Sequence, residues 1–348
     1  LFRSGLARTL EKKRRARGAL DLESRECYIV CDADGLPVDI RVRESGTSER
    51  LIESFMLAAN ECVAEHLQKA ALPAVYRVHE KPSADKAANL KAMLAPLGFA
   101  LREADNGSLQ KVLDAARGTP QAPAIHTMVL RSLMKARYDV QNLGHFGLAA
   151  KYYCHFTSPI RRYPDLMVHR ILTALLDGRL SGGVERRLAA AVQKAAVQSS
   201  QRELAAQSAE REIEKRYMAE FMAGHVGETF AGTVSGVTRF GLFVLLPGGG
   251  GGLLGVEALP GRGYRYDETR LTLTEEGGGT AYTFGMPLEV VCAAADPATG
   301  QIDFVLPGGQ LAPRPTRPAE RREEMPPRRG KDRRAMHVPK GRKGRKKR

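Results

Sequence analysis

Residues 154–170 read CHFTSPIRRYPDLMVHR, and this stretch decides the fold class and the chemistry that we expect of the chain. Ser158 followed by Pro159 predicts a helix N-terminus, because serine caps helices and proline is tolerated at the first helical position. The free N–H groups and positive dipole end of such a helix favour a bound phosphate. Arg161 and Arg162 come next, and a planar guanidinium binds phosphate oxygens two at a time.

The spacing within this stretch predicts an ion pair as well. Arg161, Asp165 and His169 are spaced four residues apart, so on one helix they share a face. We expect Asp165 to hold Arg161 while its guanidinium points at a substrate. A simpler interpretation is a capped helix with a solvent-exposed arginine pair, which is the common meaning of an isolated Arg-Arg dipeptide.

The segment His155–Asp165 resembles the signature of the ribonuclease II / ribonuclease R exoribonucleases, and the ribonuclease R branch is the nearer match. Other segments resemble the family in the family's own order over most of residues 1–306: Leu51–Glu53, Met56–Asn60, Tyr76–Pro82, Gly144–Leu148 and Ala209–Glu212. A long and chemically dense string with these companions favours membership over chance similarity.

The resemblance implies hydrolysis of RNA one nucleotide at a time from the 3′ end, with release of nucleoside 5′-monophosphates. It implies that Arg161 binds the scissile phosphate and stabilises charge in the transition state. It also implies that Glu53 contacts the ribose of the 3′-terminal nucleotide, where a carboxylate facing the 2′-OH distinguishes RNA from DNA. Glu210 is implied to lie near the terminal nucleotides. We expect further RNA contacts from the neighbours of Arg161, namely His155, Ser158, Arg162 and Tyr163.

The metal that this chemistry needs is expected to come from outside the sequence. The family binds Mg²⁺ with closely spaced aspartates, and the ion activates water and neutralises charge at the phosphate. Asp32 with Asp34 and Asp105 with Asp114 are too sparse for such a cluster, so we assign no metal ligand within the chain. The resemblance places the metal ligands, the catalytic tyrosine and the cold-shock-like domains upstream of Leu1. We therefore expect this chain alone to be inactive or nearly so.

Two residues differ from those that the family usually carries, and three histidines do not form a metal site. Leu22 stands where relatives often place a phenylalanine that stacks on the RNA end, which predicts a weaker clamp. Gly255 stands where relatives usually carry a histidine in the third strand of the closing barrel. His79, His126 and His145 lack second ligands at metal-binding spacing, so we expect them to be structural histidines.

Charge and cysteine content set the remaining limits. The formal net charge is +15, but Arg314–Arg348 holds 16 Lys/Arg against 4 Asp/Glu and carries +12, which leaves +3 for the other 313 residues. We expect this basic tail to be disordered and to attract polyanions such as RNA or the ribosome. The five cysteines have no disulfide spacing, which favours a reducing, cytoplasmic compartment. Cys27 and Cys31 are expected to be buried strand thiols, and no apolar run reaches the roughly 18 residues of a membrane span.

The pattern of apolar residues predicts an α+β fold. Helical spacing predicts helices at 1–17, 48–69, 83–95, 108–117, 126–138 and 184–222, and alternation predicts strands at 27–31, 38–42 and 75–78. Five short strands at 228–237, 241–246, 253–256, 288–293 and 301–306 predict a small OB-fold barrel. The expected domains are the C-terminal part of an RNB-type exoribonuclease catalytic domain at 1–225, an OB-fold RNA-binding domain of the ribosomal S-one type at 226–307, and the disordered tail at 308–348.

Two local patterns within these elements concern the surface. In the helix at 48–69, Glu53 and Asn60 are expected together on the polar flank of one buried stripe. The stripe consists of Leu51, Ile52, Phe55, Met56, Ala59, Cys62, Val63 and Leu67. In the barrel, Phe240 and Phe243 beside Arg239 are typical of a stacking platform for single-stranded nucleic acid. The alternative is that they are core phenylalanines, and the sequence leaves this open for Phe243 above all.

These observations support two hypotheses of different class. The first is an exoribonuclease whose N-terminal half lies outside this sequence, which acts as a monomer on the 3′ end of single-stranded RNA. The alternative is a truncated, non-hydrolytic RNA-binding protein that uses the barrel and the basic tail. A third interpretation is a ribosome-associated factor that binds through the tail.

Overall fold

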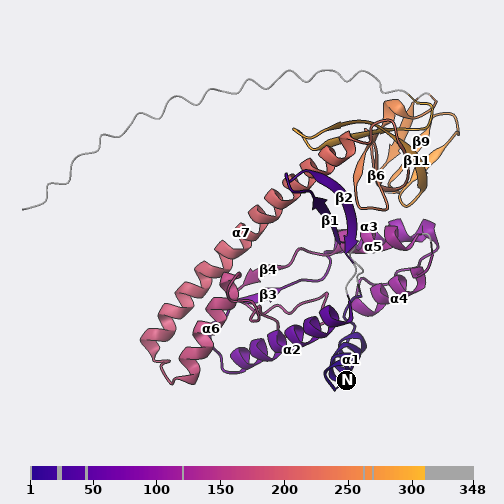
Figure 1. Ribbon diagram of the computed structural model, residues 1–348. Coiled ribbons are helices and arrows are strands. Elements are labelled where there is room, and N and C mark those ends of the chain that lie inside the picture. Colours follow the sequence, from indigo (N-terminus) through magenta and orange to yellow (C-terminus); the bar gives the residue numbers. More distant parts are fainter. Residues whose placement is uncertain are drawn as a thin grey trace, which may run out of the picture. The chain divides into compact units, whose positions relative to one another are not determined.

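The computed structural model describes residues 2–21, 26–43, 46–119, 121–261, 263–268 and 270–309. These residues form one compact unit, and Figure 1 labels its helices and several of its strands. Leu22 and the basic tail from Gln310 onward lie outside the described residues, so the weaker stacking clamp and the disordered tail stay predictions. Within the described part, no helix combines the length and the apolar character that a bilayer crossing requires.

The first elements follow the sequence pattern. Helix α1 spans Phe2–Ala16, strands β1 and β2 span Glu26–Cys31 and Pro37–Arg43, and helix α2 spans Thr47–Lys69. β1 and β2 form an antiparallel hairpin, and Gly35 in its turn takes a φ of 82°, which glycine adopts without steric cost. Cys31 is exposed, so its predicted burial is wrong, because this residue ends the strand beside the turn.

Helix α2 confirms most of the predicted apolar stripe, since Leu67 is buried and the residues at 51, 55, 56, 59 and 63 are half-buried. Its buried residues are Ser54, Asn60, Ala64 and Leu67. In contrast, Ile52 is 55% exposed and Cys62 is also exposed. The helix packs through the face that carries Asn60, because this side chain has buried partners on a later loop. A polar residue that belongs to the packed face is invisible to a hydrophobic pattern.

A mixed layer follows α2. Strand β3 (Tyr76–Val78) pairs antiparallel with β4 (Arg137–Asp139). Between them in sequence lie α3 (Ala84–Leu94), the 3-10 turn η1 (Ala95–Leu97), α4 (Asn106–Ala116) and α5 (Ala122–Ser132). The helix predicted over 126–138 therefore stops six residues early, because pairing with β3 outweighs helix propensity at its end.

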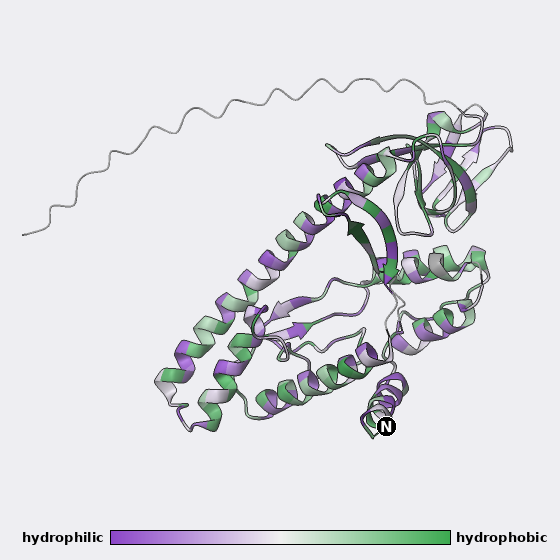
Figure 2. Cartoon of the chain, in the orientation of Figure 1, coloured by the Kyte–Doolittle hydropathy of each residue, from purple (hydrophilic) through white to green (hydrophobic). Residues whose placement is uncertain are grey.

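Helix α7 contributes to two separate cores. α6 spans Tyr163–Leu176 and α7 spans Gly182–Ala223, which confirms the long helix predicted from the sequence. Near its start α7 buries Val192, Ala195 and Ala196 against α2, β3 and α6, and near its end it buries Ala219 and Met222 in the barrel core. Its middle carries hydrophilic and hydrophobic residues in alternation, as Figure 2 shows.

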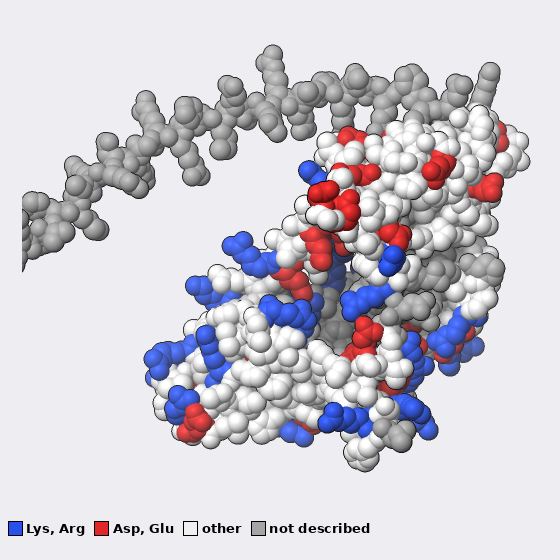
Figure 3. Space-filling model, viewed as in Figure 1, with Lys and Arg blue, Asp and Glu red and all other residues white. Residues whose placement is uncertain are grey.

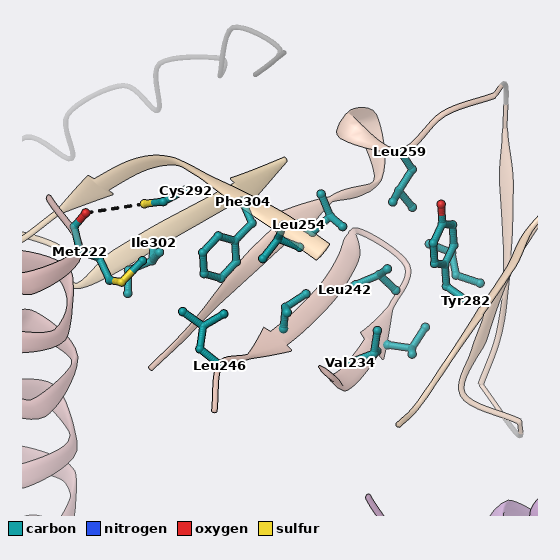
Figure 4. Packing of buried hydrophobic residues seen from close by; sticks show 14 of the residues in the cluster. Met222, Val234, Leu242, Leu246, Leu254, Leu259, Tyr282, Cys292, Ile302 and Phe304 are labelled. Carbon is teal, nitrogen blue, oxygen red and sulfur yellow. Dashed lines mark hydrogen bonds between the residues drawn. The ribbon is translucent and has the colours of Figure 1, made fainter. Parts of the chain in front are cut away.

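Residues 229–305 contain a closed barrel of five strands, as predicted. The strands are β5 (Thr229–Thr238), β6 (Gly241–Leu245), β7 (Gly251–Gly255), β11 (Pro287–Asp296) and β12 (Gln301–Val305). They close in the order β11-β12-β7-β6-β5, with β12 parallel to β7 and every other pair antiparallel. Figure 4 shows the interior, where Val234, Leu242, Leu254 and Phe304 pack together.

Between β7 and β11 the chain adds elements that the sequence did not predict. After the 3-10 turn η2 (Val256–Ala258), strands β8 (Tyr264–Asp267), β9 (Thr272–Glu275) and β10 (Ala281–Thr283) form an antiparallel three-stranded sheet. Leu273 and Tyr282 from this sheet are buried in the same core as the barrel residues. The strands are four residues long or shorter, too short for a clear alternation of side chains.

The glycine-rich loop between β6 and β7 fits closely against β1 and α7. Gly249 has a φ of 93°, and a Cβ there would overlap the Cys27 Sγ and lie 2.7 Å from the Cys27 Cβ. A Cβ on Gly250 would lie 2.9 Å from the Met218 Sδ. The loop therefore lacks side chains because the hairpin and the long helix occupy their space.

This contact predicts that Gly249→Ala destabilises the chain. Left-handed backbone costs an alanine about 1–2 kcal/mol, and the overlap with Cys27 adds about 1–3 kcal/mol. Gly118→Ala is the matched control, since Gly118 also has a positive φ of 78° but nothing within 4 Å of its added Cβ. Urea denaturation should show a clearly larger loss for Gly249→Ala, and equal losses would contradict the close fit.

Candidate nucleic-acid interface

The signature stretch forms a loop and a turn before it becomes helical. The N–H groups of Arg161 and Arg162 donate to the Ser158 carbonyl oxygen, at 3.3 and 3.1 Å. Helix α6 begins only at Tyr163, with Arg162 as N-cap and Pro164 in the first turn. The prediction that Ser158 caps the helix with Pro159 at its first position is therefore wrong. The helix starts at the second proline dipeptide, Tyr163-Pro164, whereas the first, Ser158-Pro159, lies in the separate turn.

Asp165 holds this turn from within α6. The side chain is fully buried, and its Oδ1 accepts from the Ser158 backbone N–H and from Arg162 Nη2, both at 2.8 Å. The predicted pair of Asp165 with Arg161 is wrong, because the four-residue spacing brings side chains together only inside a helix and Arg161 precedes it. His169 does not join them either, since its Nε2 bonds to the Phe156 carbonyl oxygen at 2.9 Å.

The two neighbouring arginines consequently differ in availability. Arg162 is bound to a buried carboxylate, and 21% of its side chain is exposed. Arg161 is exposed and makes no side-chain hydrogen bond or ion pair with any residue that the structure describes. Next to it, Ile160 is fully exposed and Tyr163 is 49% exposed. Arg161 is thus the arginine of this pair whose guanidinium is available to an incoming anion.

A second buried polar side chain, Asn60 of α2, holds the loop from the other side. Its Nδ2 donates to the Tyr153 hydroxyl at 3.1 Å, and its Oδ1 accepts from the Phe156 N–H at 3.0 Å. Sequence reasoning grouped Asn60 with Glu53 as a polar flank, yet Asn60 is 3% exposed and Glu53 is exposed. The missed signal was a pair of polar residues, Asn60 and Asp165, within helix faces that otherwise pack.

Histidine and tyrosine rings line the buried side of the loop. His155 Nδ1 is hydrogen-bonded to the Tyr138 hydroxyl at 2.9 Å, and His145 packs edge-on against His79 and Tyr153, with ring centroids 5.0 and 5.2 Å away. Burial, aided by Arg162 and Arg77, lowers the pKa of His155 to about 3. Burial, aided by His79 and Arg77, lowers that of His145 to about 3 as well. Both rings are therefore neutral at physiological pH.

Helix α7 is tied to this cluster through Arg77 on β3. Arg77 donates two hydrogen bonds to Glu203 of α7, at 2.6 and 3.0 Å, and its guanidinium lies 4.7 Å from the centre of the Tyr138 ring. Ser200 accepts from the Tyr138 N–H at 3.0 Å. The ring that bonds His155 is thus held by the long helix.

The three residues predicted to be catalytic come from three different elements, Arg161 from the turn before α6, Glu53 from α2 and Glu210 from α7. Glu53 is exposed on α2, and Glu210 is exposed on α7. Glu210 lines a cavity of about 1240 Å³ between β1, α7 and the barrel, which neither Arg161 nor Glu53 lines. Among the described residues no hydrogen bond or ion pair joins any two of the three, so their common role stays a prediction.

Metal binding requires several ligand side chains that converge on one point. Within the part of the chain that the structure describes, no group of three or more His, Cys, Asp or Glu side chains is placed to hold a metal ion. The five cysteines are all free. The residues described here therefore do not fit a divalent metal centre.

The barrel presents its two predicted aromatic residues at the surface. Phe240 is 51% exposed and Phe243 is 42% exposed, and their rings meet edge to face with centroids 6.1 Å apart. Arg239 beside them is also exposed. This excludes the alternative that either phenylalanine belongs to the barrel core.

Charge is divided unevenly between the helical part and the barrel. Residues 1–225 hold 34 Lys/Arg against 26 Asp/Glu, a net charge of +8, whereas residues 226–307 hold 4 against 9, a net charge of −5. Figure 3 shows basic side chains mostly over the helical part of this face and acidic ones mostly over the barrel and the adjoining end of α7. A polyanion is therefore attracted mainly to the helical part.

The comparison with known proteins identifies the family. The RNB domain matches residues 4–178, and the chain therefore belongs to the RNB-domain family. Within this family its relatives are ribonuclease R proteins, as the signature predicted: it is 44% identical to ribonuclease R 1 of Lactococcus lactis over 299 residues, and 35% identical to ribonuclease R of Escherichia coli over 321 residues.

The match covers most of this chain but a minor part of those relatives. It takes in 85% and 89% of the chain, yet 37% and 39% of the two relatives. The fold agrees with the apo form of Mycoplasma genitalium RNase R at a TM-score of 0.84 and 27% identity, over 87% of this chain and 48% of that one. The same protein in complex with ribose-methylated single-stranded RNA gives the same TM-score.

The buried histidines predict that the chain loses stability in acid. An unfolded histidine has a pKa near 6.5, whereas that of folded His155 is about 3. Between these two pH values the unfolded state binds more protons than the folded state. The contribution of His155 to the free energy of unfolding is therefore complete above about pH 6.5 and is lost as the pH falls toward about 3. In His155→Gln, we expect the slope of unfolding free energy against pH to decrease by up to about 1.4 kcal/mol per pH unit.

Urea denaturation at several pH values between about 7 and about 5 measures this slope. His66→Gln is the control, because His66 on α2 is exposed and meets solvent in both states. An unchanged slope in His155→Gln would show that its ring is not held neutral by burial.

Proposed function

We propose that this chain is the RNA-binding, C-terminal part of a processive 3′-5′ exoribonuclease that hydrolyses RNA to nucleoside 5′-monophosphates. The observation that carries the proposal is Arg161, an exposed arginine without an ion partner among the described residues, on a turn whose backbone is held by a buried carboxylate. Its membership in a family whose relatives are named ribonuclease R supports the substrate class. Arg161 binds the scissile phosphate and stabilises the charge that develops there.

The neighbours of Arg161 complete the proposed contact with the RNA end. The half-exposed ring of Tyr163 offers a surface for a ribose or base, and Ser158 and Arg162 shape the turn beneath it. His155 is neutral, so in this proposal it acts through hydrogen bonds and shape. Glu53 accepts from the terminal ribose and Glu210 lies near the last nucleotides, as the family resemblance implies.

The proposal places the ligands for Mg²⁺ outside this chain, in the part of the longer relatives that it does not span. The ion would supply activated water and charge neutralisation at the phosphate. The described residues hold no suitable ligand group, so the chain by itself binds RNA and hydrolyses it little or not at all.

We further propose that residues 226–307 are an OB-fold RNA-binding domain of the ribosomal S-one type, which follows the catalytic part at 1–225. Its support is the strand order β5-β6-β7-β12-β11, closed between β11 and β5, with the parallel pair at β7 and β12. OB-folds bind single strands by stacking bases on exposed aromatic rings. Phe240 and Phe243 are such rings. Because this segment carries a net negative charge, it contributes to RNA binding by stacking and not by attraction of phosphates.

The partner in this proposal is the 3′ end of single-stranded RNA. A structural relative is described in complexes with single-stranded and with double-stranded RNA, which supports RNA as the ligand class. The tail at 308–348 adds sequence-independent, salt-sensitive attraction to RNA or the ribosome. A monomeric state and a cytoplasmic location complete the proposal.

Binding and hydrolysis by this chain can be measured together. With a 3′-tailed single-stranded RNA and Mg²⁺, we expect tight, salt-sensitive binding with little or no release of mononucleotides. Rapid mononucleotide release would overturn the proposal that the metal site lies elsewhere. Absence of RNA binding would overturn the proposed function itself.

Arg161→Ala is expected to weaken RNA binding about tenfold, because it removes a charge-assisted phosphate contact. The plot of log affinity against log salt should also become shallower by about 0.7, the value for one phosphate contact on a single strand. Arg117→Ala is the matched control, since it removes an exposed arginine that is paired with Asp21 and with Asp114 of α4. Equal behaviour of the two variants would contradict the role of Arg161.

Phe240→Ala and Phe243→Ala are expected to weaken binding by about 1–3 kcal/mol each without a change in the salt dependence, because stacking releases no counterions. Fluorescence anisotropy with a labelled single strand measures both quantities. Phe2→Ala, which removes a ring that is 87% exposed on α1, is the control. A shallower salt slope in the barrel variants would mean that these rings do not act by stacking.

A further inference from the structure

A very short piece of backbone, residues 156–158, is held by polar side chains from two different helices. Asn60 of α2 accepts from the Phe156 N–H at 3.0 Å, and Asp165 of α6 accepts from the Ser158 N–H at 2.8 Å. His169 of α6 bonds to the Phe156 carbonyl oxygen at 2.9 Å, and its ring stacks on that of Phe156 at 4.2 Å between centroids. The residue between the two held N–H groups is Thr157.

The holding groups are shielded from water. Asn60 is 3% exposed and Asp165 is 0% exposed. A backbone N–H that loses its buried acceptor cannot turn to water without moving the loop. Residues 156–158 lead directly into the turn at Ser158–Arg162, so the same bonds fix where that turn projects. Arg161 is the exposed arginine on this turn.

Unpartnered buried polar atoms gather at the same place. The described residues contain five buried side-chain N or O atoms without a hydrogen-bond partner, and three of them are Thr157 Oγ1, Arg162 Nε and Asp165 Oδ2. Such atoms are rare in folded proteins, and each calls for an explanation beyond ordinary packing. Asp165 therefore does more than complete a helix turn.

We propose that Asp165 and Asn60 are positioning residues of the RNA site, which act on RNA through Arg161 and do not touch it. The inference rests on the proposed function, because it assigns these two residues to the same phosphate contact. A guanidinium on a fixed turn loses less conformational freedom when it binds a phosphate than one on a mobile turn. Asp165 also keeps Arg162 in an ion pair, so of the two arginines Arg161 is the one that binds the phosphate.

The test is a double-mutant cycle on RNA affinity with the full chain. Asp165→Asn, Arg161→Ala and the double variant are titrated with a labelled 3′-tailed single-stranded RNA. Asp165→Asn is expected to weaken binding about fivefold in the presence of Arg161, and less than about twofold in its absence. The salt slope of Asp165→Asn should become shallower toward that of Arg161→Ala. A residue that only stabilises the fold gives the same loss in both backgrounds and no change of slope.

Two controls separate positioning from charge and from folding. Asp114→Asn removes the same charge from an i,i+3 ion pair with Arg117 on α4, and it should bind RNA as the unmodified chain does. Thermal melting identifies a temperature at which every variant is folded, and titrations are made below it. Asn60→Ala is the second variant, because it breaks the hold on Phe156 without a change in charge, and its loss should likewise disappear in the Arg161→Ala background.

The outcomes distinguish the inference from the function on which it rests. One outcome is that Arg161→Ala weakens binding while Asp165→Asn and Asn60→Ala reduce the affinity by the same factor with and without Arg161. In that case the positioning role is overturned and the RNA site stands. If Asp165→Asn binds as the unmodified chain does, the positioning role of Asp165 is overturned. If Arg161→Ala itself has no effect, the proposed phosphate site is overturned together with the inference.

Discussion

The buried carboxylate of Asp165 is the constraint on which the candidate site depends. It accepts hydrogen bonds from the Ser158 N–H and from the Arg162 guanidinium. These bonds hold the turn at Ser158–Arg162 against the start of helix α6. Because this carboxylate neutralises Arg162, the chain can place two arginines side by side and still expose only one of them as an unpaired cation. Burial raises the cost of breaking the arrangement, since a carboxylate without water needs its donors.

The surrounding cluster extends this constraint through the helical part. Asn60 connects the loop to α2, and the Tyr138 hydroxyl connects it through His155 to β4. Arg77 and Glu203 then join β3 to α7. The histidines contribute without charge, because burial keeps their rings neutral. Positive charge in this cluster is thus carried by the arginines, of which Arg161 is exposed.

The helical part and the barrel differ in the groups that they expose. The helical part carries a net charge of +8, and the barrel segment a net charge of −5. The barrel offers exposed rings where the helical part offers an exposed guanidinium. α7 is buried at one end in each core, so a single helix joins a charged surface to a stacking surface. Exposed rings stack on any base and an exposed guanidinium contacts a phosphate of any sequence, so both surfaces fit the proposed ligand, single-stranded RNA.

Much of this was predictable from residue patterns, because long helices, a tight hairpin and five alternating strands depend on local spacing. The family signature around Arg161 is likewise a property of the sequence. Three features of the candidate site were not: the late start of α6, the choice of Arg162 over Arg161 as the partner of Asp165, and the burial of Asn60. Each depends on hydrogen bonds between residues that are far apart in the sequence or that lie outside regular helix geometry.

The sequence by itself determined the family and the order of the main helices and barrel strands, because these follow from motifs and spacing along the chain. The tertiary structure alone decided which arginine is free and which polar side chains are held inside. It also decided why the loop at Gly249 has no side chains. These outcomes depend on which groups meet in three dimensions, and a buried donor or acceptor selects its partner by distance and direction rather than by sequence separation.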